Sequence, residues 1–529
     1  MVTKDKTHIE IRNETINREL FEITDEMREA MEKARMENIR QSPPVDEPGI
    51  DEERNNFRAY DQNQDFFITV SKNSFLEESH PAVIIDFVVE RLDLTELYEQ
   101  YCDEGNRPYH PKMMLKVMFY GYYVGTMSSR TIWDCVINRA DFMYLAAGQV
   151  PNFRTINAFR LRHIERLGGL FAQIVLLCTE LGMIGFEHLA IDGQKIQANA
   201  NFKKSKNLKG LKNEYEKVKK GIEKLLAKEI NEYLPEESKE KRLGRLSEKL
   251  EELEEFQKEL EALGDEEKRL NMSDADAPVM KHKDGTSKPS YTHQSATDGK
   301  YGVVTAVQTT QANDRPEDLL KMVDASNENT GGEHERVSAD CGFCDYEVLE
   351  TVEEQRNEEF YVPDRMYENS KKDASEKNRY DLEEFSKDDE GNYVCPAGNT
   401  MKYVGVVKSA QGNEMERYIG SGCGECALKE KCTKGKQRSI CVDLRKCYRE
   451  KMREKLSSDK GREIYMKRQG LVEPLHGDDQ KNKGWKQHHL RRLEKARGEF
   501  ILVRIATNLA KIIKYKPDEV FMLALSGRT

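Results

Sequence analysis

The feature that most constrains the fold of this 529-residue chain is the segment Lys203–Leu270, where apolar residues recur every three or four positions. Lys and Glu fill most positions between them, and Pro235 separates two such runs. Apolar residues at this spacing form one stripe along a helix, which is covered when two helices pack along it. We therefore predict an antiparallel helical hairpin with a coiled-coil seam, and favour pairing within one chain over pairing between two chains. The predicted seam consists of Leu208, Leu211, Tyr215, Val218, Ile222, Leu225, Leu243, Leu246, Leu250, Leu253, Leu260 and Leu263.

Strand signals lie on both sides of the predicted hairpin. An apolar run from His188 ends at Asp192, and a second run from Arg336 ends at Asp340. Strands and helices that alternate in this order predict a mixed α/β sheet. The hairpin is then an insertion that leaves the sheet after its first strand and returns to it. Further strands are predicted at Ser290–Thr297, Tyr301–Gln311 and Glu359–Val362, and helices at Asp318–Asn327 and Tyr346–Gln355.

The chain before the sheet is predicted to be helical. Met1–Tyr60 is highly charged and poor in aromatic residues, and it holds one predicted helix, Asp25–Arg40, before the proline-rich linker Ser42–Pro44. From Phe66 to Leu181 the apolar spacing is helical. Helices are predicted at His80–Tyr98, Pro111–Val124, Ser129–Arg139 and Thr155–Leu181.

Arginines stand near the starts of these helices, at Arg130, Arg154 and Arg160. Such arginines suit contacts with phosphates or bases, but they are also ordinary surface residues. The helical region is therefore either a packing module or a DNA reader similar to a helix-turn-helix.

Composition indicates a soluble protein of the cytoplasm. Charged residues make up 34% of the chain, mean hydropathy is -0.79, and we find no apolar run of about 18 residues, so no membrane span is expected. The charged N-terminus lacks the apolar core of a secretion signal. The net charge of -11 argues against a nucleic-acid partner. Phosphate binding needs only a local basic face, however, and Lys481–Lys516 is strongly basic.

Two of the predicted strands end in an aspartate, Asp192 and Asp340. Acids at strand ends of an α/β sheet lie at the rim where ligands bind. Two carboxylates brought together repel each other unless a cation lies between them, and hard oxygen ligands suit Mg²⁺ or Mn²⁺. A third acid would complete a two-metal site for phosphoryl transfer, and Glu473, just ahead of the basic stretch, is the natural candidate. By spacing alone the signal is weak, because the chain holds 95 Asp and Glu residues.

The text around these acids resembles bacterial insertion-sequence transposases of the DDE type, which have an RNase H-like catalytic fold. The resemblance runs from about Phe66 to Lys514 and rests on several blocks in the expected order. The catalytic blocks are Ala190–Ile196, Ser338–Phe343 and Val472–Gly477, the last preceded by Tyr465 and Arg468. The others are Arg107–Pro111, Phe119–Tyr122, Ser128–Arg130, Phe153–Ile156, Asp274–Ala277 and Tyr291–Gln294.

The resemblance implies a DNA-cleaving and strand-transferring enzyme. Asp192, Asp340 and Glu473 would hold two divalent ions that activate a water or a 3′-hydroxyl. The implied partners are double-stranded DNA, both as terminal inverted repeats and as target, and further copies of the chain assembled on DNA; the implied location is the nucleoid. One position departs from the family pattern, because Gln480 stands where a lysine is expected seven residues after the glutamate. Either the neighbouring Lys481 takes over a phosphate contact, or binding of the DNA end is weakened.

A cysteine cluster begins near residue 395. Cys395, Cys423, Cys426 and Cys432 offer four thiolates, the set that tetrahedral Zn²⁺ takes in structural sites, and the alternative is a set of reduced, unpaired cysteines. The turn at Cys395–Gly398 suits the presentation of a ligand. The chain's 11 cysteines, an odd number, also favour thiols and metal ligands over a disulfide framework.

A basic helix is predicted after the third acid, either as a solvated face or as a clamp for the DNA end. Lys and Arg would hold phosphates, and Trp485 would stack on an exposed base. Phe500–Ile513 is apolar at helical spacing and is predicted to be core. The full set of predicted DNA-binding residues is Arg130, Arg154, Tyr465, Arg468, Lys481, Trp485, Lys486, Arg491 and Arg492.

Together these inferences predict an α/β protein with an RNase H-like mixed sheet core and an inserted helical hairpin, preceded by an all-helical domain and carrying a small cysteine-rich zinc subdomain. Two other functions remain open at this point, a metal-dependent nuclease of the same fold and a non-catalytic DNA-binding protein. The predicted parts are 1–65 (charged arm and linker), 66–183 (helical DNA-binding domain), 184–202 with 271–365 (catalytic core), 203–270 (hairpin), 366–445 (zinc-binding insertion) and 446–529 (C-terminal helices that complete the core).

Overall fold

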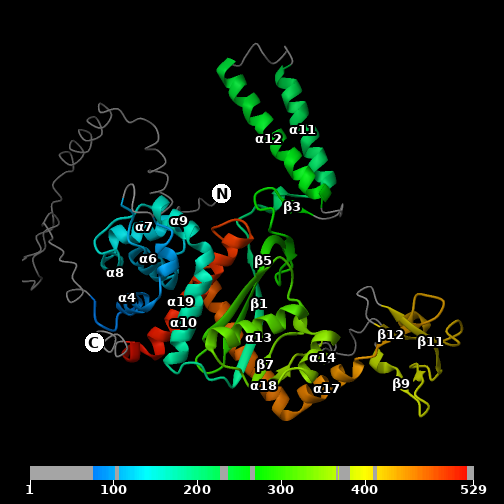
Figure 1. Ribbon diagram of the computed structural model, residues 1–529. Coiled ribbons are helices and arrows are strands. Elements are labelled where there is room, and N and C mark those ends of the chain that lie inside the picture. Colours follow the sequence, from blue (N-terminus) through cyan, green and yellow to red (C-terminus); the bar gives the residue numbers. More distant parts are fainter. Residues whose placement is uncertain are drawn as a thin grey trace, which may run out of the picture. The chain divides into compact units, whose positions relative to one another are not determined.

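The structure is a computed structural model that describes residues 76–101, 107–226, 236–262, 269–364, 367, 380, 382–408 and 414–520 (Figure 1). Internal contacts divide the chain into Met1–Ile68 and Thr69–Thr529, and everything below concerns the second unit. The helix predicted at Asp25–Arg40 and Leu263 of the predicted hairpin seam lie outside the described residues.

The predicted N-terminal helices are present and share one apolar core with the C-terminal helix α19 (Leu493–Tyr515). Prolines occupy the first position of α4 and of α6, and the preceding histidines, His80 and His110, accept a hydrogen bond from the second backbone N–H of each helix. Helix α9 begins after Asn152, whose side chain accepts a hydrogen bond from the Thr155 amide at 2.9 Å. The helices are α4 (Pro81–Arg91), α5 (Thr95–Tyr98), α6 (Pro111–Tyr123), α7 (Ser129–Asn138), α8 (Ala140–Leu145), α9 (Phe153–Arg162), η2 (Ile164–Arg166) and α10 (Leu167–Glu180).

A mixed sheet forms the centre of the fold. Its strands are β1 (His188–Gln197), β4 (Val279–Lys281), β5 (Ser287–Asp298), β6 (Val304–Thr310), β7 (Arg336–Ser338) and β8 (Glu359–Tyr361). Strand β1 pairs antiparallel with β5 and parallel with β7; β5 also pairs with β6 and β4, and β7 pairs with β8 in parallel. The prediction of a mixed α/β sheet is confirmed, and the arrangement is consistent with an RNase H-like core.

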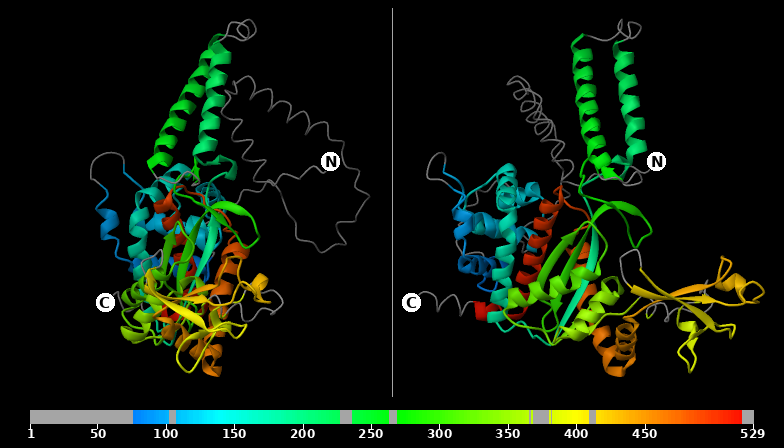
Figure 2. Two further views of the ribbon diagram at one scale, coloured as in Figure 1. Left: turned by 90° about the vertical axis from the view of Figure 1, so that its right-hand side faces the viewer. Right: turned by 45° about the vertical axis from the view of Figure 1, so that its right-hand side comes forward.

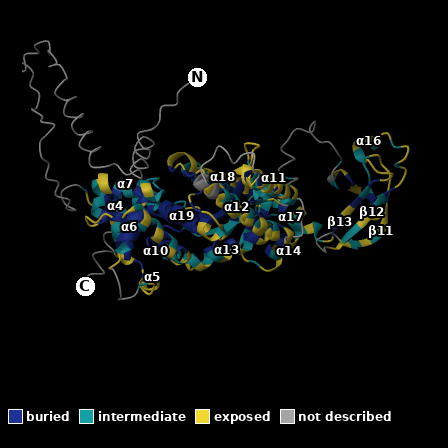
Figure 3. Cartoon of the chain, turned by 90° about the horizontal axis from the view of Figure 1, so that it is seen from above, coloured by how far each residue is buried: buried dark blue, intermediate teal, exposed yellow. Residues whose placement is uncertain are grey.

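Residues on β1 alternate between two cores because successive side chains of a strand point to opposite faces. Leu189 and Ile191 pack in a core with α13 (Pro316–Thr330), α14 (Tyr346–Glu354), α17 (Lys446–Ser457) and α18 (Asp459–Gly477). Ile196 belongs instead to the core that contains α19. Helix α19 is buried along most of its length (Figure 3), which confirms that Phe500–Ile513 is core.

The predicted hairpin is formed by α11 (Leu208–Leu226) and α12 (Glu236–Ala262), which run side by side in both views of Figure 2. The short strands β2 (Ser205–Lys206) and β3 (Leu270–Asn271) pair at its base. Its seam buries Leu211, Val218, Leu225, Leu253 and Leu260, so pairing within the chain is confirmed. Among the described residues, we find no helix long and apolar enough to cross a membrane.

The cysteine-rich region contains more strand than its turn-rich sequence suggested. Strands β11 (Met401–Lys408), β12 (Glu414–Gly420) and β13 (Ser439–Asp443) form an antiparallel sheet. Strands β9 (Ser386–Lys387) and β10 (Tyr393–Val394) pair beside it, and α16 (Lys429–Cys432) is a single turn.

The basic stretch was predicted to be helical, and this prediction is wrong for most of its length. After α18 the chain makes a π-helical turn at Asp478–Asn482 and is then irregular up to Arg492. Arg492 has a φ of 76°, which an α-helix does not accommodate. The carboxylates of Asp274 and Asp276 accept hydrogen bonds from the backbone amides of Arg492 and Leu493, and so fix the start of α19.

A buried ion pair joins these C-terminal segments to the sheet. Arg504 on α19 donates two hydrogen bonds to Asp479, at 3.0 and 2.7 Å, and neither side chain is exposed. Gln194 on β1 donates to the same carboxylate at 2.7 Å, and Arg504 also donates to Ser295 on β5 at 3.1 Å. The π-helical turn, α19 and two neighbouring strands therefore meet at one carboxylate.

We expect Asp479→Ala to lower the free energy of unfolding by about 3–5 kcal/mol, because it leaves the Arg504 guanidinium buried without its partner. Urea denaturation followed by tryptophan fluorescence measures the change, since Trp485 lies in the adjoining core. The control is Asp478→Ala, which removes a 39%-exposed partner of Lys483 and is expected to cost about 1 kcal/mol or less. Equal effects of the two substitutions would contradict the importance of the buried pair.

Candidate active site and nucleic-acid interface

Strand register brings Asp192 and Asp340 to the same edge of the sheet. Strands β1 and β7 are parallel, with Ala190 paired to Ser338. Each aspartate follows its paired residue by two positions. Neighbouring strands lie about 4.8 Å apart, so the two carboxylates are neighbours, and Asp340 contributes to the electrostatic environment of Asp192. The structure thus brings together the first two predicted acids.

Helix α18 covers this pair of acids. Nη1 of Arg468 lies 3.3 Å from Oδ1 of Asp192, and Nδ1 of His476 lies 3.7 Å from Oδ2. Burial raises the pKa of Asp192 to about 6, opposed by Arg468 and reinforced by Asp340. Burial also lowers the pKa of His476 to about 4, so this imidazole is neutral at pH 7. Arg468 is therefore the positive charge that α18 holds against Asp192.

Tyr465 and Arg468 were predicted to bind DNA, and the structure corrects this. Tyr465 is 7% exposed and belongs to the core beneath the sheet, and Arg468 is 8% exposed beside Asp192. Both side chains lie on the buried face of α18 because the helix packs on β1, β5, β7 and β8.

Glu473, the third predicted acid, is exposed on α18. It precedes His476 by three positions, which corresponds to about 60° around the helix axis and about 4.5 Å along it. Among the described residues, the structure brings Asp192 and Asp340 together, while Glu473 lies exposed on α18 one turn before the His476 that contacts Asp192.

Sequence reasoning missed a further acid, Asp314, in the loop between β6 and α13. A Cβ atom added at Gly193 would lie 2.1 Å from Oδ1 of Asp314, so this carboxylate fills the space beside the glycine that follows Asp192. Asp314 also contributes to raising the pKa of Asp192. The available signal was an acid four residues after the end of β6 and two residues before Pro316, the first residue of α13.

The donor set at this edge fits a hard divalent cation. Three carboxylates, from Asp192, Asp314 and Asp340, affect one another electrostatically, and Arg468 pairs with one of them. Within the described ranges, we find no three His, Cys, Asp or Glu side chains already gathered closely enough to enclose a metal ion. The chemistry of the donors, all oxygen, matches Mg²⁺ or Mn²⁺.

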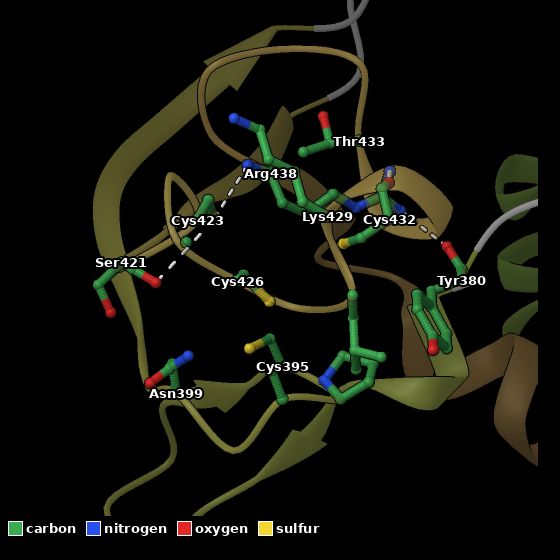
Figure 4. Close-up of a pocket in the computed structure, with 14 residues that line it drawn as sticks. Tyr380, Cys395, Asn399, Ser421, Cys423, Cys426, Lys429, Cys432, Thr433 and Arg438 are labelled. Carbon is green, nitrogen blue, oxygen red and sulfur yellow. Dashed lines mark hydrogen bonds between the residues drawn. The ribbon is translucent and has the colours of Figure 1, made fainter.

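The four predicted zinc ligands line one pocket (Figure 4). The sulfur atoms of Cys395 and Cys426 point toward one another, and the thiols of Cys395, Cys423 and Cys426 influence the pKa of Cys432, which burial raises. The backbone amide of Arg438 donates to Sγ of Cys423 at 3.5 Å. The predicted turn at Cys395 is also present, closed by the amide of Gly398 donating to the Cys395 carbonyl at 2.7 Å.

Trp485 does not present a stacking surface to DNA, which corrects that prediction. Its side chain is 1% exposed and stacks on Phe500, with ring centroids 5.9 Å apart and an interplanar angle of 10°. His293 and His488 lie against it, each with a centroid distance of 5.3 Å. The irregular backbone after the π-helical turn directs this large apolar side chain inward.

The other predicted DNA-binding residues are exposed: Arg130, Arg154, Lys481, Lys486, Arg491 and Arg492. Arg130 and Arg154 lie over the ring of Phe153, at 5.1 and 5.8 Å from its centroid. Both arginines line a surface cavity together with His489 and Leu490. The starts of α7 and α9 therefore adjoin the basic segment, which we define as Lys481–Arg492.

The basic segment is attached to the end of β1. The amide of His488 donates to the Gln197 carbonyl at 2.8 Å, and Nδ2 of Asn199 donates to the His489 carbonyl at 2.7 Å. Glu499 is fully buried and accepts hydrogen bonds from the amides of His489 and Leu490 and from both histidine rings. One strand thus carries Asp192 in its middle and the basic segment at its end.

Comparison with known protein families gives two matches. The family described as "Transposase DDE domain" matches residues 394–513, and the family described as "Transposase domain (DUF772)" matches residues 70–162. The first match includes Glu473, the four pocket cysteines and the basic segment. The second includes most of the N-terminal helices. No curated protein matches the chain.

We expect Gly193→Ala to lower the free energy of unfolding by about 1–3 kcal/mol, because the added Cβ overlaps the carboxylate of Asp314. Chemical denaturation measures the loss. The control is Gly169→Ala in α10, where no atom lies within 4 Å of the added Cβ and where alanine is expected to be neutral or to stabilise by up to about 1 kcal/mol. Unchanged stability of Gly193→Ala would show that Asp314 moves aside without loss.

Proposed function

The chain belongs to the DDE transposases, a family that cleaves DNA and transfers strands, and from this premise we propose that it cuts and rejoins the ends of its own insertion sequence with two divalent metal ions. The observation that carries the proposal is that Asp192 and Asp340 each follow, by two residues, the paired Ala190 and Ser338 of adjacent parallel strands. Acids so placed face a common point at the rim of the sheet. Glu473, exposed on α18, would be the third acid of the site.

The residues of this site have separate tasks in the proposed reaction. Asp192 and Asp340 would hold the ions between them, and Glu473 would complete the set from α18. Two bound divalent ions supply activation of a water or 3′-hydroxyl nucleophile and stabilisation of the leaving oxygen. Arg468 holds Asp192 in place and balances part of its charge. Gly193 keeps the backbone beside Asp192 free of a side chain.

The basic segment would guide DNA to this site. From Asp192 to Gln197 strand β1 spans about 17 Å at ~3.3 Å per residue, which equals about five base pairs at 3.4 Å each. Phosphates that follow β1 from the acids would then meet Lys486, Arg491 and Arg492, and beyond them Arg130 and Arg154. Exposed Lys481 stands next to Gln480 and would supply the phosphate contact that the family pattern assigns to a lysine.

We further propose a function for each part of the chain and an assembly of several copies of the chain on DNA, both of which follow from a transposase function. The helical region 66–183 would bind DNA, 184–202 with 271–365 would hold the acids, 203–270 is an inserted hairpin, and 446–529 completes the core. The partners are terminal inverted repeats, target DNA and further copies of the chain, at the nucleoid. The pocket of Cys395, Cys423, Cys426 and Cys432 would hold a structural Zn²⁺ within 366–445.

Replacing any of the three acids is expected to abolish metal-dependent cleavage while DNA binding persists. The assay combines the flanking terminal DNA with Mg²⁺ or Mn²⁺ and follows cleavage and joining on gels; electrophoretic mobility shift measures binding. Asp192→Asn, Asp340→Asn and Glu473→Gln should each lower the cleavage rate at least 1000-fold. Glu463→Gln, which changes an equally exposed acid on the same helix, is the matched control and should retain the wild-type rate.

The assay also separates the competing functions. Cleavage without joined products would favour a nuclease of the same fold. Binding without cleavage in the wild type would favour a DNA-binding protein and remove the two-metal reading. Full activity of one acid variant would remove that residue from the site.

Zinc analysis of the purified chain tests the cysteine pocket. We expect about one zinc per chain, lost in Cys423→Ser and Cys432→Ser because a structural zinc requires four ligands. The melting temperature should fall in these variants and on treatment with a strong chelator. Cys441→Ser changes an exposed cysteine of the same region and should retain the metal. Absence of zinc in the wild type, with a melting temperature insensitive to chelator, would reject the site.

A further inference from the structure

Asp314 lies against the acid pair although it is far from either aspartate in sequence. Its Oδ1 occupies the position where a Cβ on Gly193 would be, only 2.1 Å away. A Cβ at Gly342, two residues after Asp340, would lie 3.1 Å from Cβ of Asp314 and 3.0 Å from Oδ1 of Asp340. Two glycines, one beside each predicted catalytic aspartate, therefore provide the space that Asp314 enters.

A buried glutamine holds Asp314 in this position. Gln294 is fully buried on β5, opposite Gly193 in the strand register. Its Nε2 donates to Oδ1 of Asp314 at 2.9 Å, while its Oε1 finds no hydrogen-bond partner in the described part of the chain. The glutamine thus uses its donor to aim one carboxylate oxygen at β1, and the second oxygen is left for another ligand.

Asp192, Asp314 and Asp340 influence one another electrostatically at this edge of the sheet. Arg468 lies 3.3 Å from Asp192. Among the described residues, we find no cation within ion-pair distance of Asp314; Lys195 is near enough to influence it, but its Nζ donates to the Lys281 carbonyl at 2.8 Å. A divalent cation beside Asp314 would lower the repulsion among the three carboxylates.

We propose that Asp314 is a fourth metal-binding carboxylate of the active site, which shares one of the two divalent ions with Asp340 from the α13 side of β1. The inference rests on the proposed function and adds a ligand to it. The side chain of Asp192 points to one face of β1, so Asp314 would hold the ion from the opposite face, where Gly193 leaves space for it. This explains why Gly193 follows Asp192: any side chain there would displace the ligand.

Asp318, four residues further on, provides a natural comparison. Nε2 of Gln294 lies 3.4 Å from its Oδ2, and Gln308 donates to its Oδ1 at 2.9 Å. Nζ of Lys321 lies 3.9 Å from that Oδ1. Asp318 is buried with these partners, so its charge is satisfied within the protein and it is not expected to bind the ion.

The test measures Mn²⁺ binding to the full-length chain by isothermal titration calorimetry and the melting temperature with and without Mn²⁺. Asp314→Asn should weaken Mn²⁺ binding at least tenfold and reduce the rise in melting temperature that Mn²⁺ causes. Without metal its melting temperature should equal or exceed that of the wild type, because one repelling charge is gone. Asp318→Asn should bind Mn²⁺ within twofold of the wild type.

Asp192→Asn separates failure of this inference from failure of the proposed function. If Asp192→Asn loses Mn²⁺ and Asp314→Asn binds it like the wild type, Asp314 is not a ligand and the proposed two-metal site stands. If Asp192→Asn also binds like the wild type, the two-metal site itself is overturned. A melting temperature of Asp314→Asn that falls without metal, with Mn²⁺ affinity unchanged, would assign Asp314 a structural role only.

Discussion

The buried pair of Asp479 and Arg504 holds together the parts of the chain that make the site. The two residues lie 25 positions apart, on the π-helical turn after α18 and on α19, and the hydrogen bond from Gln194 ties them to β1. A buried guanidinium is tolerated only when its donors are satisfied, and here Asp479 and Ser295 satisfy them. The position of α18 on the sheet is therefore fixed, because any shift of this helix along the sheet would break several charged hydrogen bonds at once.

This anchor bears directly on the acids, because Asp192 and Gln194 point to the same face of β1. Gln194 binds Asp479 in the turn that follows α18, and Asp192 meets His476 and Arg468, three and eleven residues before Asp479. The opposite face of β1 is left to Gly193 and Asp314. Each face of the sheet thus has a neutral glutamine that binds a carboxylate: Gln194 donates to Asp479 on one face, and Gln294 donates to Asp314 on the other.

Sequence reasoning succeeded where local pattern decides the structure. The hairpin, the start of β1 at His188 and the core face of α19 follow from periodicity, which the sequence displays directly. The predicted end of that strand at Asp192 is wrong, because β1 continues to Gln197. Prediction from the sequence failed where tertiary packing decides which side chains are buried. Trp485 and Arg468 stand among basic residues in sequence, yet one completes an aromatic cluster with Phe500 and the other pairs with Asp192. Asp314 was missed because its neighbours come from β1, β5 and the turn after β7, and no spacing along the chain reveals that these segments meet.

The same packing explains how a chain with a net charge of -11 presents a basic surface. The exposed lysines and arginines of the basic segment stand on buried or capping carboxylates: Glu499 holds the turn at His489 and Leu490, and Asp274 holds the amide of Arg492. Glu499 also binds the ring of His489, and Asp274 also accepts a hydrogen bond from the hydroxyl of Tyr291. The negative residues therefore shape the backbone from within, while the positive side chains that they position stay at the surface, where Arg492 also pairs with Asp276 at 3.4 Å. The total charge says little about the partner because the two signs occupy different layers of the structure.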